Sequence, residues 1–260
     1  MNARVLLASL LLALPALARE PKIVIDAGHG GSQQGALSPT GYLEKELSLA
    51  LAKKVGAALQ KSINAKVVLT REDDVLLPLQ DRVDISNKHR ADLFVSLHAN
   101  SMPTKKLREQ VAGIQTFFLS ANASTDGARR TADRENADGT HAVAGPGRDV
   151  LGFILADLQR AEAHVDSSRL AHAVHQSVIA GTGGVDRGVQ QAPFYVLAGV
   201  EAPAILLEVG FISHPDEGKK LQDAAYQDKL AQAVAQGIQA FLEEVARRDT
   251  RGAQSTSAPR

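Results

Sequence analysis

The strongest constraint on the fold is the alternation of short apolar runs with longer amphipathic stretches in the N-terminal part of the chain. Lys22 to Asp26, Ala65 to Thr70 and Ala91 to Asn100 are apolar and rich in β-branched residues, as is typical of buried strands. Between these runs, Tyr42 to Lys61 and Leu77 to Arg90 carry apolar residues at helical spacing. Strands that alternate with helices form a mostly parallel sheet, because a parallel neighbour needs a crossover connection. We therefore predict an α/β fold.

The C-terminal part of the chain is expected to complete the same sheet. The apolar pattern predicts strands at Gly113 to Ser120, Phe194 to Gly199 and Pro203 to Phe211, and helices at Ser167 to Gly181 and Ala225 to Arg248. A single domain is expected over residues 22–246, with a twisted, mostly parallel sheet flanked by helices. The polar tail, residues 249–260, is expected to be disordered.

Residues from about 121 to 165 interrupt this pattern. They mix charged residues with glycine and proline and show no strong period. Because long stretches without regular structure are uncommon inside a compact domain, we interpret this segment as an insertion. It is expected to be helical in part, around Arg129 to Ala137 and again from Val150 to Gln159.

The bulk composition excludes several classes of partner and site. The chain has 260 residues with 29 basic and 29 acidic side chains, so its net charge is zero. A nucleic acid or an anionic membrane would favour a clustered basic surface, and we expect neither as a partner. The chain has no cysteine, so any metal site must use histidine and carboxylate ligands.

Residues 1–18 have the pattern of a secretory signal peptide. An arginine precedes an apolar run that is too short to span a bilayer comfortably, and Ala16-Leu17-Ala18 is a small-x-small cleavage pattern. An uncleaved membrane anchor is the alternative, which the short run and the missing charged stop disfavour. We expect an exported protein with no membrane span after cleavage.

Four polar side chains stand where parallel sheets bind ligands, at the carboxyl ends of their strands. His29 follows the first strand in a glycine-rich turn, His98 ends the third strand, and Glu208 ends the run AILLE. Glu44 opens the helix that follows the loop after His29. The plainer alternatives are a turn histidine, a hydrogen-bonded core histidine and a solvated glutamate favoured by the helix dipole. Glu208 gives the sharpest signal, because a carboxylate among apolar residues is costly to bury without a partner.

Two histidines and a carboxylate together suit a catalytic zinc site. His29, Glu44 and His98 would leave the fourth position open for water. The same set can hold Fe²⁺, but export and the lack of other redox residues favour zinc. Glu208 could then take a proton from the attacking water and pass it to a leaving nitrogen. His172 and His175 have the spacing of a second metal pair, but we expect them on a partly exposed helix face because no carboxylate is placed to complete a site.

Five motifs in order point to a known family: IDAGHGG, GALSPTGYLEKELSL, TREDD followed by LPLQDR, FVSLHAN and LLEVGFIS. From about Lys22 to Val245 the chain resembles the zinc-dependent N-acetylmuramoyl-L-alanine amidases, cell-wall hydrolases of the amidase-3 type. The resemblance implies that peptidoglycan is cut between N-acetylmuramic acid and L-alanine, for wall remodelling and daughter-cell separation. It implies one Zn²⁺ per chain, with ligands His29, Glu44 and His98, and Glu208 as the catalytic residue. Glu46 competes with Glu44, but the Glu-Lys pair of the family aligns with Glu44-Lys45.

The resemblance also implies regulation. Periplasmic division amidases of this family carry a helix in the corresponding insertion, which covers the zinc until an activator protein removes it. On that basis we expect a periplasmic protein with an activator partner, in which Glu135 blocks the zinc. Deleting about residues 128–157 is then expected to raise activity. Arg82 and Asn100 are candidates for substrate contact, although Arg82 could instead form an ion pair at the helix surface.

Two other functions are compatible with the same residues. A zinc peptidase could use the same ligands to cut a different bond of peptidoglycan, such as a peptide cross-link. A non-catalytic wall-binding module could keep the fold, but it would have no need of a general base at Glu208.

Overall fold

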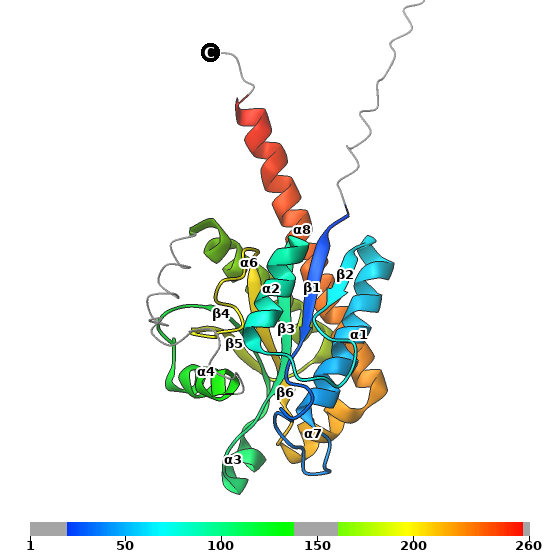
Figure 1. Cartoon of the computed structure of the whole chain (residues 1–260), viewed down its shortest axis with the longest axis vertical. Helices are drawn as coiled ribbons and strands as arrows, with labels where there is room; N and C mark the ends of the chain where they lie inside the picture. The colour runs from blue at the N-terminus through cyan, green and yellow to red at the C-terminus, as the bar shows by residue number, and fades with distance from the viewer. Residues whose placement is uncertain (1–19, 138–160, 257–260) are drawn as a thin grey trace, which may run out of the picture.

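The computed structural model describes residues 20–137 and 161–256 (Figure 1). A six-stranded sheet has the order β2-β1-β3-β6-β4-β5. Its strands are β1 (Lys22–Ala27), β2 (Lys66–Leu69), β3 (Leu93–Asn100), β4 (Ile114–Leu119), β5 (Asp186–Ala192) and β6 (Ala204–Phe211). All neighbours pair in parallel except β4 and β6, which are antiparallel. The prediction of one mostly parallel sheet is confirmed.

Helices cover both faces of the sheet. They are α1 (Glu44–Ile63), α2 (Leu79–His89), α3 (Lys105–Gln110), α4 (Asp126–Ala137), α6 (Ala161–Thr182), α7 (Pro215–Gln222) and α8 (Ala224–Thr256). On one face α1 and α6 pack against the long α8, which projects beyond the sheet (Figure 1). On the other face α2, α4 and the segment 193–202 enclose a second apolar cluster.

β1 shows why the central strands are apolar without a break. Ile23 and Ile25 lie in the cluster beneath α1 and α8, and Val24 lies in the opposite cluster. All three side chains are fully buried, because successive residues of a strand point to opposite faces and both faces are covered here. A polar side chain at the end of such a strand is therefore held in place by a rigid, dry framework.

The carboxyl ends of β1, β3 and β6 form one edge of the sheet. Ala27 pairs with Leu97, and His98 pairs with Glu208, so that the polar ends of all three strands come together. The register between β3 and β6 shifts after His98, which is how a sheet redirects a side chain next to a site. The sequence analysis predicted the candidate site at this edge of the sheet.

One predicted strand is wrong. Phe194 to Gly199 forms turns, and the strand in this region is β5, just before it. β5 lies at the edge of the sheet and pairs only with β4 among the described strands, so it does not need an apolar sequence on both faces. The apolar side chains of Phe194 and Leu197 instead fill the core beneath the sheet as part of the turns.

The predicted disordered tail is also wrong over most of its length. Helix α8 continues to Thr256, and residues 257–260 lie outside the described part. Extending an existing helix avoids the cost of nucleation, and the first proline after Arg248 is Pro259. Polarity alone was therefore a poor guide to disorder at this position.

The insertion contains the first of its two predicted helices. Residues 129–137 lie within α4, which begins three residues earlier at Asp126. The second predicted helix, residues 150–159, and the predicted signal peptide, residues 1–18, lie outside the described residues. None of the helices in the described ranges is long and apolar enough to cross a membrane.

Candidate metal centre

The glycine-rich turn after β1 makes room for the side chains around it. A Cβ atom at Gly28 would lie 2.4 Å from Cε1 of His98, and one at Gly35 would lie 2.7 Å from both Glu44 Oε2 and the ring of His29. His29 itself has a left-handed backbone with a φ of 59°, which is uncommon for a residue other than glycine. The turn therefore uses glycine to bring the imidazole rings and Glu44 into direct contact.

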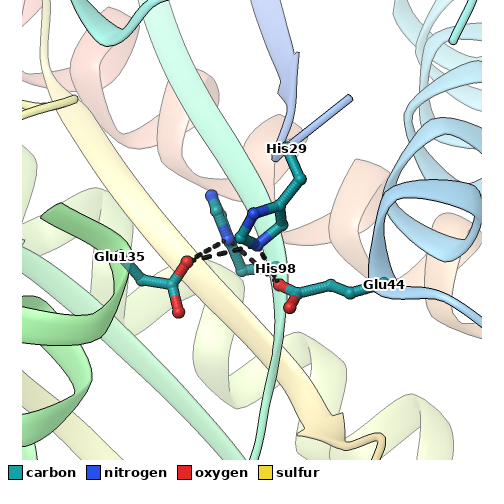
Figure 2. A group of neighbouring side chains, drawn as sticks. All are labelled: His29, Glu44, His98 and Glu135. Carbon is teal, nitrogen blue, oxygen red and sulfur yellow. Dashed lines mark hydrogen bonds and ion pairs between the residues drawn. The ribbon is translucent and has the colours of Figure 1, made fainter. Parts of the chain in front are cut away.

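Four side chains from distant parts of the sequence converge at this edge of the sheet: His29, Glu44, His98 and Glu135 (Figure 2). Their possible ligand atoms all lie within 4.8 Å of one another, and all four residues are buried. Oε1 of Glu44 lies 2.8 Å from Nε2 of His29 and 3.1 Å from Nδ1 of His98. The structure thus brings together the two histidines and the carboxylate that the sequence suggested.

The backbone holds the carboxylate of Glu44 in a fixed orientation. Its Oε1 accepts a hydrogen bond from the N–H of Ala99 at 2.9 Å, and its Oε2 accepts one from the N–H of Ala36 at 2.8 Å. Burial and the charge of Glu135 oppose ionisation, but the charge of His29 and the side-chain hydrogen bonds with His29 and His98 outweigh them and lower the pKa of Glu44 to about 2. The side chain is therefore ionised and preoriented, as a metal ligand would need to be.

Glu135 closes the group from the opposite side, on helix α4. Its Oε2 lies 2.9 Å from Nδ1 of His98 and 3.3 Å from Nε2 of His29. Burial opposes the charge on the ring of His98, but Glu135 and Glu44 outweigh it and raise the pKa of His98 to about 9. When both imidazoles are neutral, as metal ligands must be, the two carboxylates carry two negative charges, which a divalent cation would neutralise.

Glu208 lies outside this group of possible ligands but next to it. It lies within β6 opposite His98, and its side chain is fully buried. Burial, with the neighbouring Glu135, raises the pKa of Glu208 to about 8. Within the described residues, its Oε2 has no hydrogen-bond partner. A raised pKa and a free oxygen are the properties expected of a group that exchanges protons.

Arg134, next to Glu135 on α4, links both acidic groups to the loop after β3. Its Nη2 lies 2.7 Å from Oε1 of Glu135 and 3.3 Å from Oε1 of Glu208. Its Nη1 donates to Oδ1 of Asn100 at 3.0 Å and to the carbonyl of Ser101 at 3.1 Å. The sequence analysis missed this residue, because adjacent residues of a helix point in different directions and no local pattern marked Arg134.

Arg82 is neither at the helix surface nor accessible to a substrate. It is 1% exposed, so the surface ion pair was wrong. Its guanidinium donates to Oδ1 of Asp26 at 2.7 Å and to the carbonyls of Leu77, Ala27 and His29. The burial of Arg82 does not fit the substrate contact predicted for it, and its bond to His29 makes it a positioning residue for the turn.

Asn100 is also buried, beneath helix α4. It is 1% exposed, and its amide nitrogen donates to Oε1 of Gln115 at 2.9 Å and to Oγ1 of Thr131 at 3.3 Å. Because Thr131 and Arg134 both belong to α4, a substrate could reach Asn100 only after α4 moves. Its predicted role in substrate binding stays a prediction.

The second pair of histidines does not form a metal site. His172 is exposed, whereas His175 is buried, so the expectation of a partly exposed face was wrong for His175. Its Nε2 contacts Oδ1 of Asp186 at 2.8 Å and its Nδ1 contacts Oγ1 of Thr116 at 3.0 Å. Among the described residues, the one group able to hold a metal is the one around His29.

Taken together, the sheet edge defines a class: a hydrolase of α/β architecture whose buried histidines and carboxylates could hold a metal ion, next to a protonatable glutamate. Comparison with known proteins gives the family. Residues 23–240 match the amidase-3 family model, described as N-acetylmuramoyl-L-alanine amidase. The chain belongs to this family, whose members hydrolyse the amide bond between N-acetylmuramic acid and L-alanine in peptidoglycan.

Individual relatives agree with this assignment. N-acetylmuramoyl-L-alanine amidase AmiA of Escherichia coli K12 is 36% identical over 223 residues, which cover 85% of this chain and 75% of that protein. AmiC of Neisseria meningitidis serogroup B is 32% identical, covering 86% of this chain and 53% of the relative. The solved amidase from Clostridium difficile 630 is 30% identical, with a TM-score of 0.66 over 87% of this chain and 98% of that chain. The resemblance found in the sequence is confirmed.

Proposed function

We propose that this amidase is a zinc enzyme in which His29, Glu44 and His98 hold one Zn²⁺ and Glu208 transfers protons. One observation carries the proposal: the ring nitrogens of both histidines lie within 3.1 Å of the same oxygen of Glu44. Donor atoms that share one tetrahedral zinc lie about 3.4 Å apart. Oε1 of Glu44 lies 2.8 Å and 3.1 Å from the two ring nitrogens, and all possible ligand atoms of the group lie within 4.8 Å of one another, so a small rearrangement would accommodate the ion.

Zinc fits the reaction better than Fe²⁺, which the same ligands can hold. Hydrolysis of an amide involves no change of oxidation state, and a bound zinc ion would supply Lewis-acid activation of the carbonyl and of the attacking water. Glu44 is fixed by two backbone N–H groups, which is the support that an orienting ligand needs. The donor set therefore suits a hydrolytic zinc site.

Glu208 is suited to move the proton. Its free Oε2 would accept a proton from the attacking water and pass it to the nitrogen of L-alanine as the amide bond breaks. Because burial raises the pKa of Glu208 above its ordinary value, its carboxylate is a stronger base than a solvated glutamate, and once protonated it can act as the acid in the second step. The lactyl carboxylate then stays on the sugar, and the peptide leaves with a free amino terminus.

Helix α4 would hold the enzyme in an inhibited state. Glu135 lies against both imidazoles on the side opposite Glu44 (Figure 2), where it would take the position that water needs. Arg134 pairs with Glu208, which ties the carboxylate to α4 and away from an attacking water. One helix would thus obstruct both the metal and the proton acceptor.

An inhibited state of this kind needs a partner that displaces α4. A solved relative, the CwlD amidase from Clostridioides difficile, is described in complex with the GerS lipoprotein; it is 26% identical, with a TM-score of 0.64 over 86% of this chain. We extend this to an activator protein for the present chain. Because peptidoglycan lies outside the cytoplasmic membrane, the enzyme would be exported and act in the periplasm.

The test combines metal analysis with digestion of purified peptidoglycan. The protein as purified should contain one zinc per chain. Glu208→Gln should lose about 10²- to 10⁴-fold in rate, because a general base is removed, while its zinc content stays unchanged. Both proteins should also be assayed with Glu135→Gln added, so that a low basal rate does not hide the loss.

A matched control is Glu201→Gln, which makes the same change at an exposed glutamate in the loop before β6. It should keep the wild-type rate. If Glu208→Gln hydrolyses peptidoglycan as fast as Glu201→Gln, the proton-transfer role is wrong.

Product analysis separates the two rival functions. The amidase releases peptides that begin with L-alanine and leaves the sugar chains intact. A peptidase acting on cross-links would instead leave the stem peptides attached to the sugar. A wall-binding module would release no product from peptidoglycan and would retain binding in Glu208→Gln.

A further inference from the structure

A cavity of about 680 Å³ opens beside the metal centre. Its walls come from the loops that follow β1, β3 and β6, which are the three strands that end at the site. Ala36 belongs to one wall and donates its N–H to Oε2 of Glu44. Ser101 belongs to another and directly follows the strand that carries His98. The cavity therefore adjoins the residues of the proposed zinc site.

The lining combines a small apolar surface with two cations. Ala36, Leu37 and Pro39 form the apolar part, and the side chain of Leu37 is 54% exposed. Lys105 and Arg108, on the short helix α3, supply the positive charge. No aromatic residue is among the described residues that line the cavity. Sugar sites commonly stack a ring on an aromatic face, so this lining suits a peptide with small side chains and carboxylates better than a glycan.

The guanidinium of Arg108 is hydrogen-bonded to backbone carbonyls but is not paired with a carboxylate within the described residues. Its Nε donates to the carbonyl of Met102 at 2.6 Å, and its Nη2 approaches the carbonyl of Pro103 at 3.5 Å. These bonds fix the guanidinium at the rim of the cavity without neutralising it. Among the ion pairs of the described residues, none involves Arg108 or Lys105, and Glu109 is the one acidic residue in the lining.

We propose that this cavity binds the stem peptide of the substrate and that Arg108 and Lys105 bind carboxylates of that peptide. The inference rests on the proposed function, since it assigns one side of the scissile amide to this cavity. The L-alanine end would lie at the zinc site, between Glu44 and Glu208. The free carboxylates further along the stem would reach α3, where a charge-assisted bond to a fixed guanidinium gives both affinity and selection.

The cavity does not depend on helix α4. None of the residues that line it belongs to α4, although α4 covers the histidines. A free stem peptide should therefore bind the intact chain, even while Glu135 lies against the proposed zinc ligands. This separates peptide binding from catalysis.

Isothermal titration calorimetry on the intact, zinc-containing protein tests the proposal. The probe is the tripeptide L-alanyl-γ-D-glutamyl-meso-diaminopimelate, compared with the same peptide in which every carboxylate is a carboxamide. The double variant Lys105→Gln, Arg108→Gln should bind the charged tripeptide about 10- to 100-fold more weakly, the range of charge-assisted hydrogen bonds. The amidated peptide should bind wild type weakly and lose little more in the double variant.

Lys106→Gln is the matched control, because Lys106 lies on the same helix and is exposed but does not line the cavity. It should bind the tripeptide like wild type. Equal binding of the tripeptide by the double variant and by Lys106→Gln would overturn the proposal. Competition between N-acetylmuramic acid and the tripeptide would also overturn it, because the cavity would then bind the sugar.

The titration is repeated with Glu208→Gln to separate this inference from the proposed function. The free tripeptide contains no scissile bond, so its binding needs neither Glu208 nor turnover. Normal binding with lost hydrolysis supports both ideas. The alternative outcome is that wild type and the double variant bind the tripeptide equally, while Glu208→Gln loses hydrolysis as expected. That outcome would overturn the peptide assignment and leave the proposed function standing.

Discussion

Two clusters of buried charged side chains lie near the carboxyl end of β1, one around Asp26 and one around His29. Their charges are compensated in different ways. Asp26 is fully buried, and its carboxylate accepts hydrogen bonds from Thr70 and Ser96 at 2.6 Å each and from Arg82 at 2.7 Å. All of these partners lie on or beside the strands and α2. The cluster of His29, Glu44 and His98, by contrast, is completed by Arg134 and Glu135 from α4.

The difference teaches where buried charge serves stability and where it serves function. A buried carboxylate needs a compensating partner in either case. Around Asp26 the partner is permanent, because Arg82 also bonds the carbonyls of Ala27 and His29. Around His29 the imidazole rings are paired with Glu135, which comes from one helix of an insertion, and a metal ion could take the place of this pairing. Exchangeable compensation is what makes the second cluster a site.

The largest effect is expected at the permanent partner. Arg82→Met leaves Asp26 with an unpaired buried charge, so the free energy of unfolding should fall by about 3–5 kcal/mol. Urea denaturation followed by circular dichroism measures this. Arg130→Met is the control, since Arg130 is exposed on α4, and it should change stability by less than about 0.5 kcal/mol. A loss in Arg82→Met no larger than in the control would mean that Asp26 is not held as described.

Removing the charge of Glu135, the exchangeable partner, should raise activity, whereas removing Arg82 lowers stability. Glu135→Gln weakens the contact between α4 and the histidines, so hydrolysis of peptidoglycan by the zinc-loaded protein should rise about 5- to 150-fold, the range of couplings worth 1–3 kcal/mol. Dye release from labelled peptidoglycan gives the rate. The control is Asp133→Asn, an exposed acidic residue on the same helix, which should leave the rate unchanged.

The same variant, Glu135→Gln, can also contradict the distinction between a permanent and an exchangeable partner. If the variant loses stability and gains no activity, then α4 is a permanent partner like Arg82, and the inhibitory role is wrong. A rise in Asp133→Asn equal to that in Glu135→Gln would point to the net charge of the helix and not to the contact with the histidines.

The sequence identified the parts of the site that sit at strand ends. His29, His98 and Glu208 interrupt apolar runs, and such an interruption is visible without any tertiary information. Glu44 was found because it opens the helix after the same loop. Their convergence then follows from the parallel topology, since the carboxyl ends of parallel strands share one edge.

The contribution of α4 could not be derived in the same way. Glu135 was nominated by family resemblance, and nothing in the local pattern shows that its neighbour Arg134 reaches Glu208. Adjacent residues of a helix point about 100° apart, so both reach the site only because of how α4 lies on the edge of the sheet. The burial of Arg82 could not be foreseen for a related reason: its pairing with Asp26 joins β1 to α2 across 56 residues.

A smaller effect is expected on the pH dependence of the free energy of unfolding, to which the Asp26 cluster should contribute. Burial opposes the ionisation of Asp26, but Arg82 and the hydroxyls of Ser96 and Thr70 outweigh it, so its pKa lies below its ordinary value of 3.8. A lowered pKa in the folded state contributes stability that is present above the unfolded value and is lost as the pH falls through the folded value. Each unit of lowering contributes about 1.4 kcal/mol.

Unfolding free energies measured between neutral and acid pH test this. Wild type should lose stability steeply below pH 3.8, whereas Asp26→Asn, which is less stable throughout, should show a shallower acid limb. Parallel limbs in the two proteins would show that Asp26 does not titrate with folding.

The smallest effect is expected for a pair outside both clusters, and it sets the scale for them. Lys54 on α1 pairs with Asp228 on α8, and these side chains are 30% and 57% exposed. Because water already solvates both charges, Asp228→Asn should lower the free energy of unfolding by only about 0.2–1 kcal/mol, and added salt should remove the difference. Urea denaturation at low and high salt measures both quantities. A loss as large as that in Arg82→Met would mean that burial does not separate these pairs, and the contrast between permanent and exchangeable compensation would lose its physical basis.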